Sequence, residues 1–139
     1  MNITKHFTFK ELVSTSYENV EAENIYYAVD NMKEVQALAE FAEEVRKVLG
    51  VPMIITSGVR CPRLNSFVKG SKTSDHVRCR AIDFITTKIS VKKAFELLQK
   101  SKLKFKQLIY ERNTWVHISM PEKNKREVLV YDGEKYKRV

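Results

Sequence analysis

The sequence predicts a single domain over residues 1–139 of the α+β class, with N-terminal helices packed on a mostly antiparallel sheet of about four to five strands. Two observations support this class. Apolar residues recur at helical spacing in the first half, whereas short β-branched and apolar runs separated by turn residues fill the second half. A chain of 139 residues is long enough to bury a core without disulfides.

The helical patterns lie mainly in the first half. Thr8 and Glu11 fit a capping box that opens a short helix. A longer helix is predicted over about 32–49, because apolar residues recur there at helical spacing and Gly50 is a natural stop: Val35, Leu38, Ala42, Val45 and Leu49. The segment 14–30 is weakly patterned, so we expect a loop with one helical turn.

Short apolar runs predict the strands, and they lie mostly in the second half. The runs are Met53–Thr56, Arg80–Thr86, Gln107–Tyr110, Trp115–Ser119 and Val128–Tyr131, the last followed by an Asp132-Gly133 turn and one more short strand. Ser90 caps a helix with an apolar face. The segment 57–75 reads as a long irregular loop, and loops of that length in compact domains are usually functional or disordered.

Charge is spread unevenly along the chain. Residues 1–59 carry 5 Lys/Arg and 9 Asp/Glu, whereas residues 60–139 carry 20 and 8. The basic half would attract an anionic partner, such as nucleic acid, an acidic cell-wall polymer or a substrate carboxylate. No nucleic-acid recognition motif is present, which disfavours nucleic acid. For Lys123–Arg138 the favoured interpretation is a solvated lysine-rich surface.

From the sequence we expect neither a membrane span nor a secretory signal peptide. No run of about eighteen apolar residues occurs, and the N-terminus lacks the apolar region of a secretory signal. We therefore expect synthesis in the cytoplasm without a signal peptide. Cys61 and Cys79 are expected to be reduced thiols, with a disulfide between them as the alternative.

Three residues have the character of zinc ligands: His76, Asp83 and His117. Asp83 lies within an apolar strand, where a carboxylate needs a compensating charge or a metal. An open three-ligand zinc site leaves a position for water and lowers the pKa of that water toward neutrality. The alternative interpretation is a loop histidine, a hydrogen-bonded buried carboxylate and a core histidine. His6, the remaining histidine, is expected to be structural.

The run ITSGVRCPRLNSFVKGSKTSDHVRCRAIDF, followed by W-V-H, resembles the signature of the D-alanyl-D-alanine carboxypeptidase family of zinc peptidases. The opening KHFTFKEL is also similar to small phage-type and bacterial endolysin-like members. The resemblance implies a hedgehog/D-Ala-D-Ala-peptidase-like fold, a Zn²⁺ cofactor, and His76, Asp83 and His117 as its ligands.

The resemblance also implies roles for residues around the metal. Arg60 would bind substrate or stabilise the oxyanion, and Ser74 would bind substrate, with loop capping as its alternative role. Gln107 would line the same cleft. The usual acidic position three residues before the last histidine is Thr114 here, so Glu111 is the expected general base. A solvent-facing turn glutamate is the alternative interpretation of Glu111.

The sequence departs from the family pattern at two places. Cys79 replaces a family glycine, and its thiol, three residues after His76, raises the alternative of a closed, structural zinc site. The family's double glycine is reduced to Lys69-Gly70. Asn65 is expected to hold this loop through side-chain-to-backbone hydrogen bonds.

The sequence therefore predicts a zinc metallopeptidase that hydrolyses peptide bonds of peptidoglycan stem peptides, as a D-Ala-D-Ala carboxypeptidase or an endopeptidase of endolysin type. It is expected to be a monomer that acts at the cell wall after release or phage-like delivery, with an anionic wall polymer as a further partner. The alternative is a catalytically impaired, zinc-containing binding or structural module of the same fold.

Overall fold

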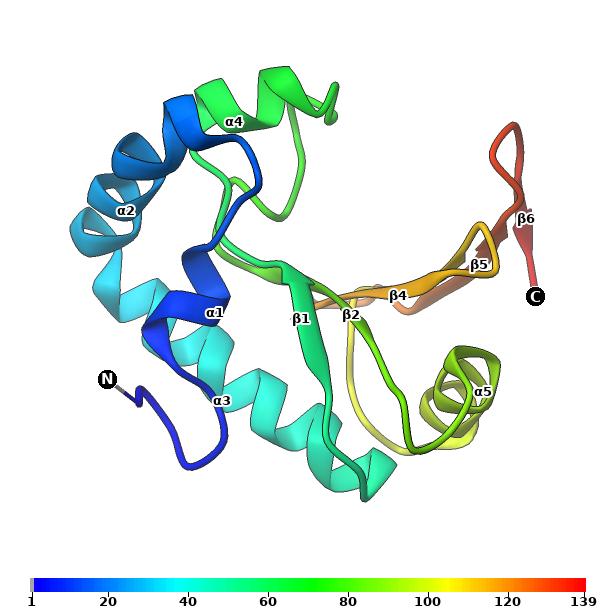
Figure 1. Ribbon diagram of the computed structural model, residues 1–139. Coiled ribbons are helices and arrows are strands. Elements are labelled where there is room, and N and C mark those ends of the chain that lie inside the picture. Colours follow the sequence, from blue (N-terminus) through cyan, green and yellow to red (C-terminus); the bar gives the residue numbers. More distant parts are fainter. Residues whose placement is uncertain (1) are drawn as a thin grey trace. The chain divides into compact units, whose positions relative to one another are not determined.

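The computed structural model describes residues 2–139 and is of the α+β class, as predicted (Figure 1). The helices are α1 (Phe9–Val13), η1 (Glu18–Val20), α2 (Glu21–Asp30), α3 (Met32–Leu49), α4 (Pro62–Phe67) and α5 (Val91–Lys100). The strands are β1 (Ile54–Ser57), β2 (Ala81–Ile85), β3 (Gln107–Glu111), β4 (Trp115–Ser119), β5 (Glu127–Tyr131) and β6 (Tyr136–Arg138). They form one mixed, mostly antiparallel sheet in the order β1-β2-β4-β3-β5-β6.

The chain divides into two compact units, one of residues 1–43 and 57–82 and the other of residues 44–56 and 83–139. In the first unit, Thr8 and Glu11 form the predicted capping box at α1. His6 is tied to α3, since its Nδ1 lies 2.7 Å from Glu43 Oε1. This contact supports the structural role expected for His6.

The prediction of a loop over residues 14–30 was wrong, because η1 and the ten-residue helix α2 occupy most of it. The buried residues of α2 are Asn24 and Ala28, so its inner face carries no large apolar periodicity. Asn24 donates to the carbonyls of Val13 and Val59 and accepts from the Cys61 N–H at 2.7 Å. The inner face of α2 is therefore anchored by the polar side chain of Asn24, whereas helix prediction depends on apolar residues at these positions.

The segment 57–75 is also more ordered than predicted. It contains α4, which begins with Pro62 at its first turn, a position where the missing N–H costs nothing. Asn65 donates from Nδ2 to the Ser71 carbonyl at 2.9 Å, which confirms its expected role in holding the loop.

In the second unit, β3 pairs antiparallel with β4 and parallel with β5, and β5 pairs antiparallel with β6. The sheet has six strands, one for each run predicted from the sequence, whereas about four to five were expected to join one sheet. Arg112 and Asn113 both have positive φ values, 50° and 57°, in the tight turn that joins β3 to β4. Helix α5 packs against β3 and β4 (Figure 1), and Phe95 of α5 stacks on Tyr110.

Because α5 contacts Tyr110, the side chains that alternate with Tyr110 lie on the other face of the sheet. His117 pairs with Ile109, and Glu111 pairs with Trp115, so all four share that face. We call it the His117 face. Within residues 2–139, no helix has the length and apolar character needed to cross a membrane.

Candidate metal centre

Contacts with the protein itself hold the His76 side chain in place. Its side chain is buried, with 2% of the residue exposed, and its Nδ1 lies 2.8 Å from the carbonyl oxygen of Gly58. A carbonyl oxygen only accepts hydrogen bonds, so Nδ1 carries the proton and Nε2 carries the lone pair of the neutral ring. This is the orientation that a metal-binding histidine receives from an outer partner.

Close packing explains why residue 58 is a glycine. A Cβ on this residue would lie 2.4 Å from the carbonyl oxygen of Leu12, a backbone atom that cannot swing aside. The neighbouring Val59 N–H donates to the same Leu12 carbonyl at 2.8 Å. Glycine is therefore required for the backbone approach that places the Gly58 carbonyl against His76.

Asp83 and His117 contact each other within the second unit. Asp83 lies on β2 among buried apolar neighbours, and His117 lies on β4. His117 Nδ1 is 2.8 Å from Asp83 Oδ1, and both side chains are about nine-tenths buried. This contact supplies part of the compensation that a carboxylate in an apolar strand needs.

The potential ligand atoms of His76, Asp83 and His117 all lie within 4.8 Å of one another. Two imidazole nitrogens and one carboxylate oxygen are the donor set of an open zinc site. His76 meets a further requirement, because its outer nitrogen is already occupied by Gly58. The residues present therefore fit a zinc ion, and the group is a candidate metal centre.

Cys79 does not belong to this group among the residues that the structure describes. Its backbone adopts φ +58°, the left-handed region that a glycine would occupy without strain. Burial raises the pKa of the thiol to about 11, and the negative charge of Glu34 on α3 adds to the shift. The closed cysteine site is disfavoured because the Cys79 sulfur lies outside the group of ligand atoms. Both cysteines are free thiols.

Arg60 is oriented by two neighbours in its own unit. Its Nε donates to Ser57 Oγ and its Nη1 donates to Asn65 Oδ1, each at 3.3 Å. Gly70 allows the loop to close over this pair, since a Cβ there would lie 2.0 Å from Asn65 Oδ1 and 3.1 Å from Arg60 Nη1. The retained glycine of Lys69-Gly70 thus keeps the guanidinium in place.

Ser74 acts on the turn that presents His76. Its Oγ accepts a hydrogen bond from the His76 backbone N–H at 3.2 Å, and its carbonyl accepts one from Val77. These contacts are those of a loop-capping hydroxyl, the alternative that the sequence left open.

Glu111 and His117 lie on the His117 face as diagonal neighbours across β3 and β4, within reach of long side chains. Gln107 lies four residues before Glu111 on β3, so its side chain points to the same face. Its Nε2 donates a hydrogen bond to Glu127 Oε1 at 2.8 Å. Thr114 has no acidic group to offer and closes the turn by donating its N–H to the Glu111 carbonyl.

Two features of the candidate site were not predicted from the sequence. One is the Gly58 carbonyl that orients His76, and a glycine directly after a predicted strand is a usable signal for close backbone approach. The other is Trp115, whose indole Nε1 is buried with no hydrogen-bond partner in the described part of the chain, as is Ser119 Oγ. Both lie on the His117 face beside His117. Buried polar atoms without partners mark places where a ligand or water is expected.

Comparison with known proteins gives one family. The sequence model described as Peptidase M15 matches residues 5–119, a range that includes His76, Asp83 and His117 as well as Arg60, Ser74, Gln107 and Glu111. Residues 120–139, with β5 and β6, lie beyond the match. No curated protein matches the chain.

Proposed function

The chain belongs to the peptidase M15 family of zinc peptidases, and we propose that it hydrolyses peptide bonds in the stem peptides of peptidoglycan. The observation that carries the proposal is the group of His76, Asp83 and His117, whose ligand atoms lie within 4.8 Å of one another. A family of metallopeptidases and an open three-ligand donor set point to the same chemistry.

His76, Asp83 and His117 would hold the zinc ion, His76 through Nε2 because Nδ1 is committed to Gly58. When bound, zinc would supply Lewis acidity and lower the pKa of water toward neutrality. The burial of His76 and Asp83 excludes competing solvent from two of the three ligands.

Glu111 is the proposed general base. Its support is its place on the His117 face, diagonal to His117 and directly opposite Trp115. Its carboxylate would accept a proton from water as the water oxygen bonds to the scissile carbonyl carbon. It would then donate that proton to the amine nitrogen as the carbon–nitrogen bond breaks.

Arg60 is the proposed partner of the substrate's negative charge, either a carboxylate or the oxyanion that develops at the scissile carbonyl. The hydrogen bonds that Arg60 donates to Ser57 and Asn65 support this, because they fix the guanidinium before substrate arrives. Ser74 would serve the substrate site by holding the turn of His76. Gln107, at the other end of β3 from Glu111, would line the substrate cleft on the His117 face.

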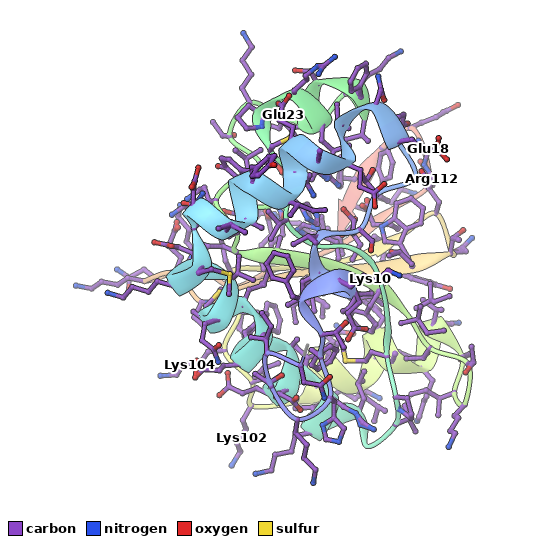
Figure 2. All side chains as sticks on the ribbon, turned by 60° about the vertical axis from the view of Figure 1, so that its left-hand side comes forward. Lys10, Glu18, Glu23, Lys102, Lys104 and Arg112 are labelled. Atoms are coloured by element: carbon purple, nitrogen blue, oxygen red, sulfur yellow. The ribbon has the colours of Figure 1, made fainter. Side chains whose placement is uncertain are left out.

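The finer features of the function are also proposals. A carboxypeptidase would release a terminal D-Ala, whereas an endopeptidase of endolysin type would cut an internal bond. The same proposed zinc ligands and general base would serve either activity. The excess of lysine and arginine in residues 60–139 supports an anionic wall polymer as a partner. Lys102 and Lys104, both exposed, project away from the ribbon (Figure 2). We propose a monomer that acts at the cell wall.

Digestion of purified peptidoglycan tests the proposal. Wild-type protein loaded with one equivalent of zinc should release new amines and shorter muropeptides, identified by mass. The Glu111→Gln variant should keep its zinc and lose activity by about 10²–10⁴-fold, the range for removal of a general base.

The mass of the product assigns the bond that is cut. Loss of a single D-Ala identifies a carboxypeptidase, and separation of cross-linked stems identifies an endopeptidase. Wild-type product no greater than that of Glu111→Gln, with zinc bound in both proteins, would favour the catalytically impaired module instead.

A further inference from the structure

One row of side chains crosses the His117 face from β4 to β6. Trp115 of β4 pairs with Glu111 of β3, Glu111 pairs with Tyr131 of β5, and Tyr131 pairs with Tyr136 of β6. Directly opposed residues in a sheet point to the same face. The proposed base is therefore flanked on both sides by aromatic residues, and the row runs on to the edge strand.

The two tyrosine rings stack against each other, so each covers one face of the other. Their ring centroids are 4.3 Å apart with an interplanar angle of 26°, and Tyr136 is 57% exposed. The Arg112 guanidinium lies over the Tyr131 ring, 5.6 Å from its centroid. Arg112 is the turn residue labelled in Figure 2. The Tyr131 hydroxyl donates to the Gly133 carbonyl at 2.9 Å, which orients that ring.

The charge of Glu111 acts on the outer tyrosine of the pair. Burial is the main cause that raises the pKa of the Tyr136 hydroxyl, and the charge of Glu111 is the next. Both tyrosines also lie in residues 120–139, outside the segment matched by the family. The two strands thus extend the face that carries the proposed chemistry.

We propose that Tyr136, backed by the stacked ring of Tyr131, forms a sugar-binding subsite, which holds a pyranose ring of the glycan strand while its attached peptide lies along Glu111 and His117. The inference rests on the proposed function, because a peptidoglycan substrate carries its peptide on a sugar. It adds a specificity element that a free peptide would not use.

The chemistry of the row favours a sugar over an apolar side chain. A pyranose has one face of C–H groups, which packs on an aromatic ring, and a rim of hydroxyls, which needs polar partners. Tyr136 offers the exposed side of its ring with a hydroxyl at its edge, Tyr131 supports that ring from behind, and Arg112 adds donors beside the pair. An apolar side chain would leave these polar groups unmatched.

Binding is tested without catalysis. The Asp83→Ala variant of the full chain would be titrated with the tetramer of N-acetylglucosamine, and binding followed by NMR. Tyr131 and Tyr136 signals should shift, and adding Tyr136→Ser should raise Kd by about 10-fold, as loss of one stacking ring would. Tyr26→Ser, at a tyrosine of α2 that is 70% exposed, is the matched control and should leave Kd unchanged. Tetramer binding that Tyr136→Ser and Tyr131→Ser leave intact would overturn the proposal, as would the absence of binding.

Hydrolysis gives an independent readout. Wild-type protein should cleave a disaccharide-linked stem peptide with a kcat/KM about 10-fold above that for the free peptide, and Tyr136→Ser should abolish this preference. Equal kcat/KM for the two substrates in the wild type would overturn the subsite. Tetramer binding at the tyrosines without hydrolysis of either substrate would support the subsite and contradict the proposed function.

Discussion

His76 Nδ1 lies 2.8 Å from the carbonyl oxygen of Gly58, and this contact determines which nitrogen of the ring is available to a metal. Because the carbonyl accepts the Nδ1 proton, the Nε2 lone pair is the one that remains. Gly58 can approach so closely only because it lacks a Cβ, which would meet the Leu12 carbonyl at 2.4 Å. A backbone packing requirement therefore sets the tautomer of a proposed zinc ligand.

Gly58→Ala should weaken zinc binding. The new Cβ would displace the carbonyl from His76, and loss of an outer-shell partner costs about 10–100-fold in metal affinity. Competition with a chromophoric chelator measures that affinity. Gly50→Ala is the control, since nothing lies within 4 Å of a Cβ at Gly50, where φ is +70°. It should lower stability by about 1–2 kcal/mol through backbone strain and leave zinc affinity unchanged. Equal zinc affinity in both variants would contradict the role given to Gly58.

Gly70→Ala should lower activity without loss of metal. Its Cβ would lie 2.0 Å from Asn65 Oδ1, so Asn65 would move and release the Arg60 guanidinium. A misplaced catalytic group costs on the order of 100-fold in rate, and kcat/KM on a stem peptide measures it. Lys69→Ala alters the adjacent residue, whose φ is +56°, without adding a group beside Asn65. If Gly70→Ala retains full kcat/KM, Arg60 does not depend on this loop.

Cys79→Gly should be more stable than Cys79→Ala. Both variants lose the buried thiol, but only glycine adopts φ +58° without strain, a difference of about 1–2 kcal/mol. Chemical denaturation of the two variants measures the difference. The native thiol should also resist alkylation at pH 8 in the folded protein, since burial raises its pKa to about 11. A more stable alanine variant would show that strain at Cys79 is absent.

The β5–β6 hairpin should loosen in acid. The backbone N–H groups of Lys135 and Glu134 lower the pKa of Asp132 below its ordinary value of 3.8. A carboxyl whose pKa is lower in the folded than in the unfolded protein stabilises the fold when the pH is above its unfolded pKa. That stabilisation is lost as the pH falls through the folded pKa. NMR contacts between the Tyr131 and Tyr136 rings should therefore fade below about pH 3.8.

Asp132→Asn is the control for this titration. Asparagine keeps an acceptor oxygen in the turn but has no carboxyl proton to gain. Its ring contacts should not change over the same pH range. Identical fading in both proteins would assign the change to other carboxylates.

The sequence predicted those parts of the fold that follow from apolar periodicity and capping. Helix α3 and strand β4 have the predicted bounds, 32–49 and 115–119. Helix α2 was missed because the buried Asn24 holds it through three backbone hydrogen bonds, which no hydrophobic pattern reveals. Hydrogen bonds to residues outside the helix stabilise α2 in place of a buried apolar stripe.

The sequence predicted which three residues would gather at the candidate site, but it did not predict the contacts that support them. His76, Asp83 and His117 stand in a recognisable motif, and the structure brings their ligand atoms together. The contact of Gly58 with His76 joins residues 18 apart in sequence, and the row from Trp115 to Tyr136 depends on a parallel β3–β5 pairing. Register between distant strands cannot be read from one strand alone.

The zinc content of two variants tests the central claim most directly. Purified wild-type protein should bind one zinc ion per chain, as measured by elemental analysis after dialysis. Asp83→Ala should lose that zinc, and Cys79→Ala should retain it, because the proposed ligands are two imidazoles and a carboxylate. Zinc retained by Asp83→Ala and lost from Cys79→Ala would contradict the account and assign the metal to sulfur.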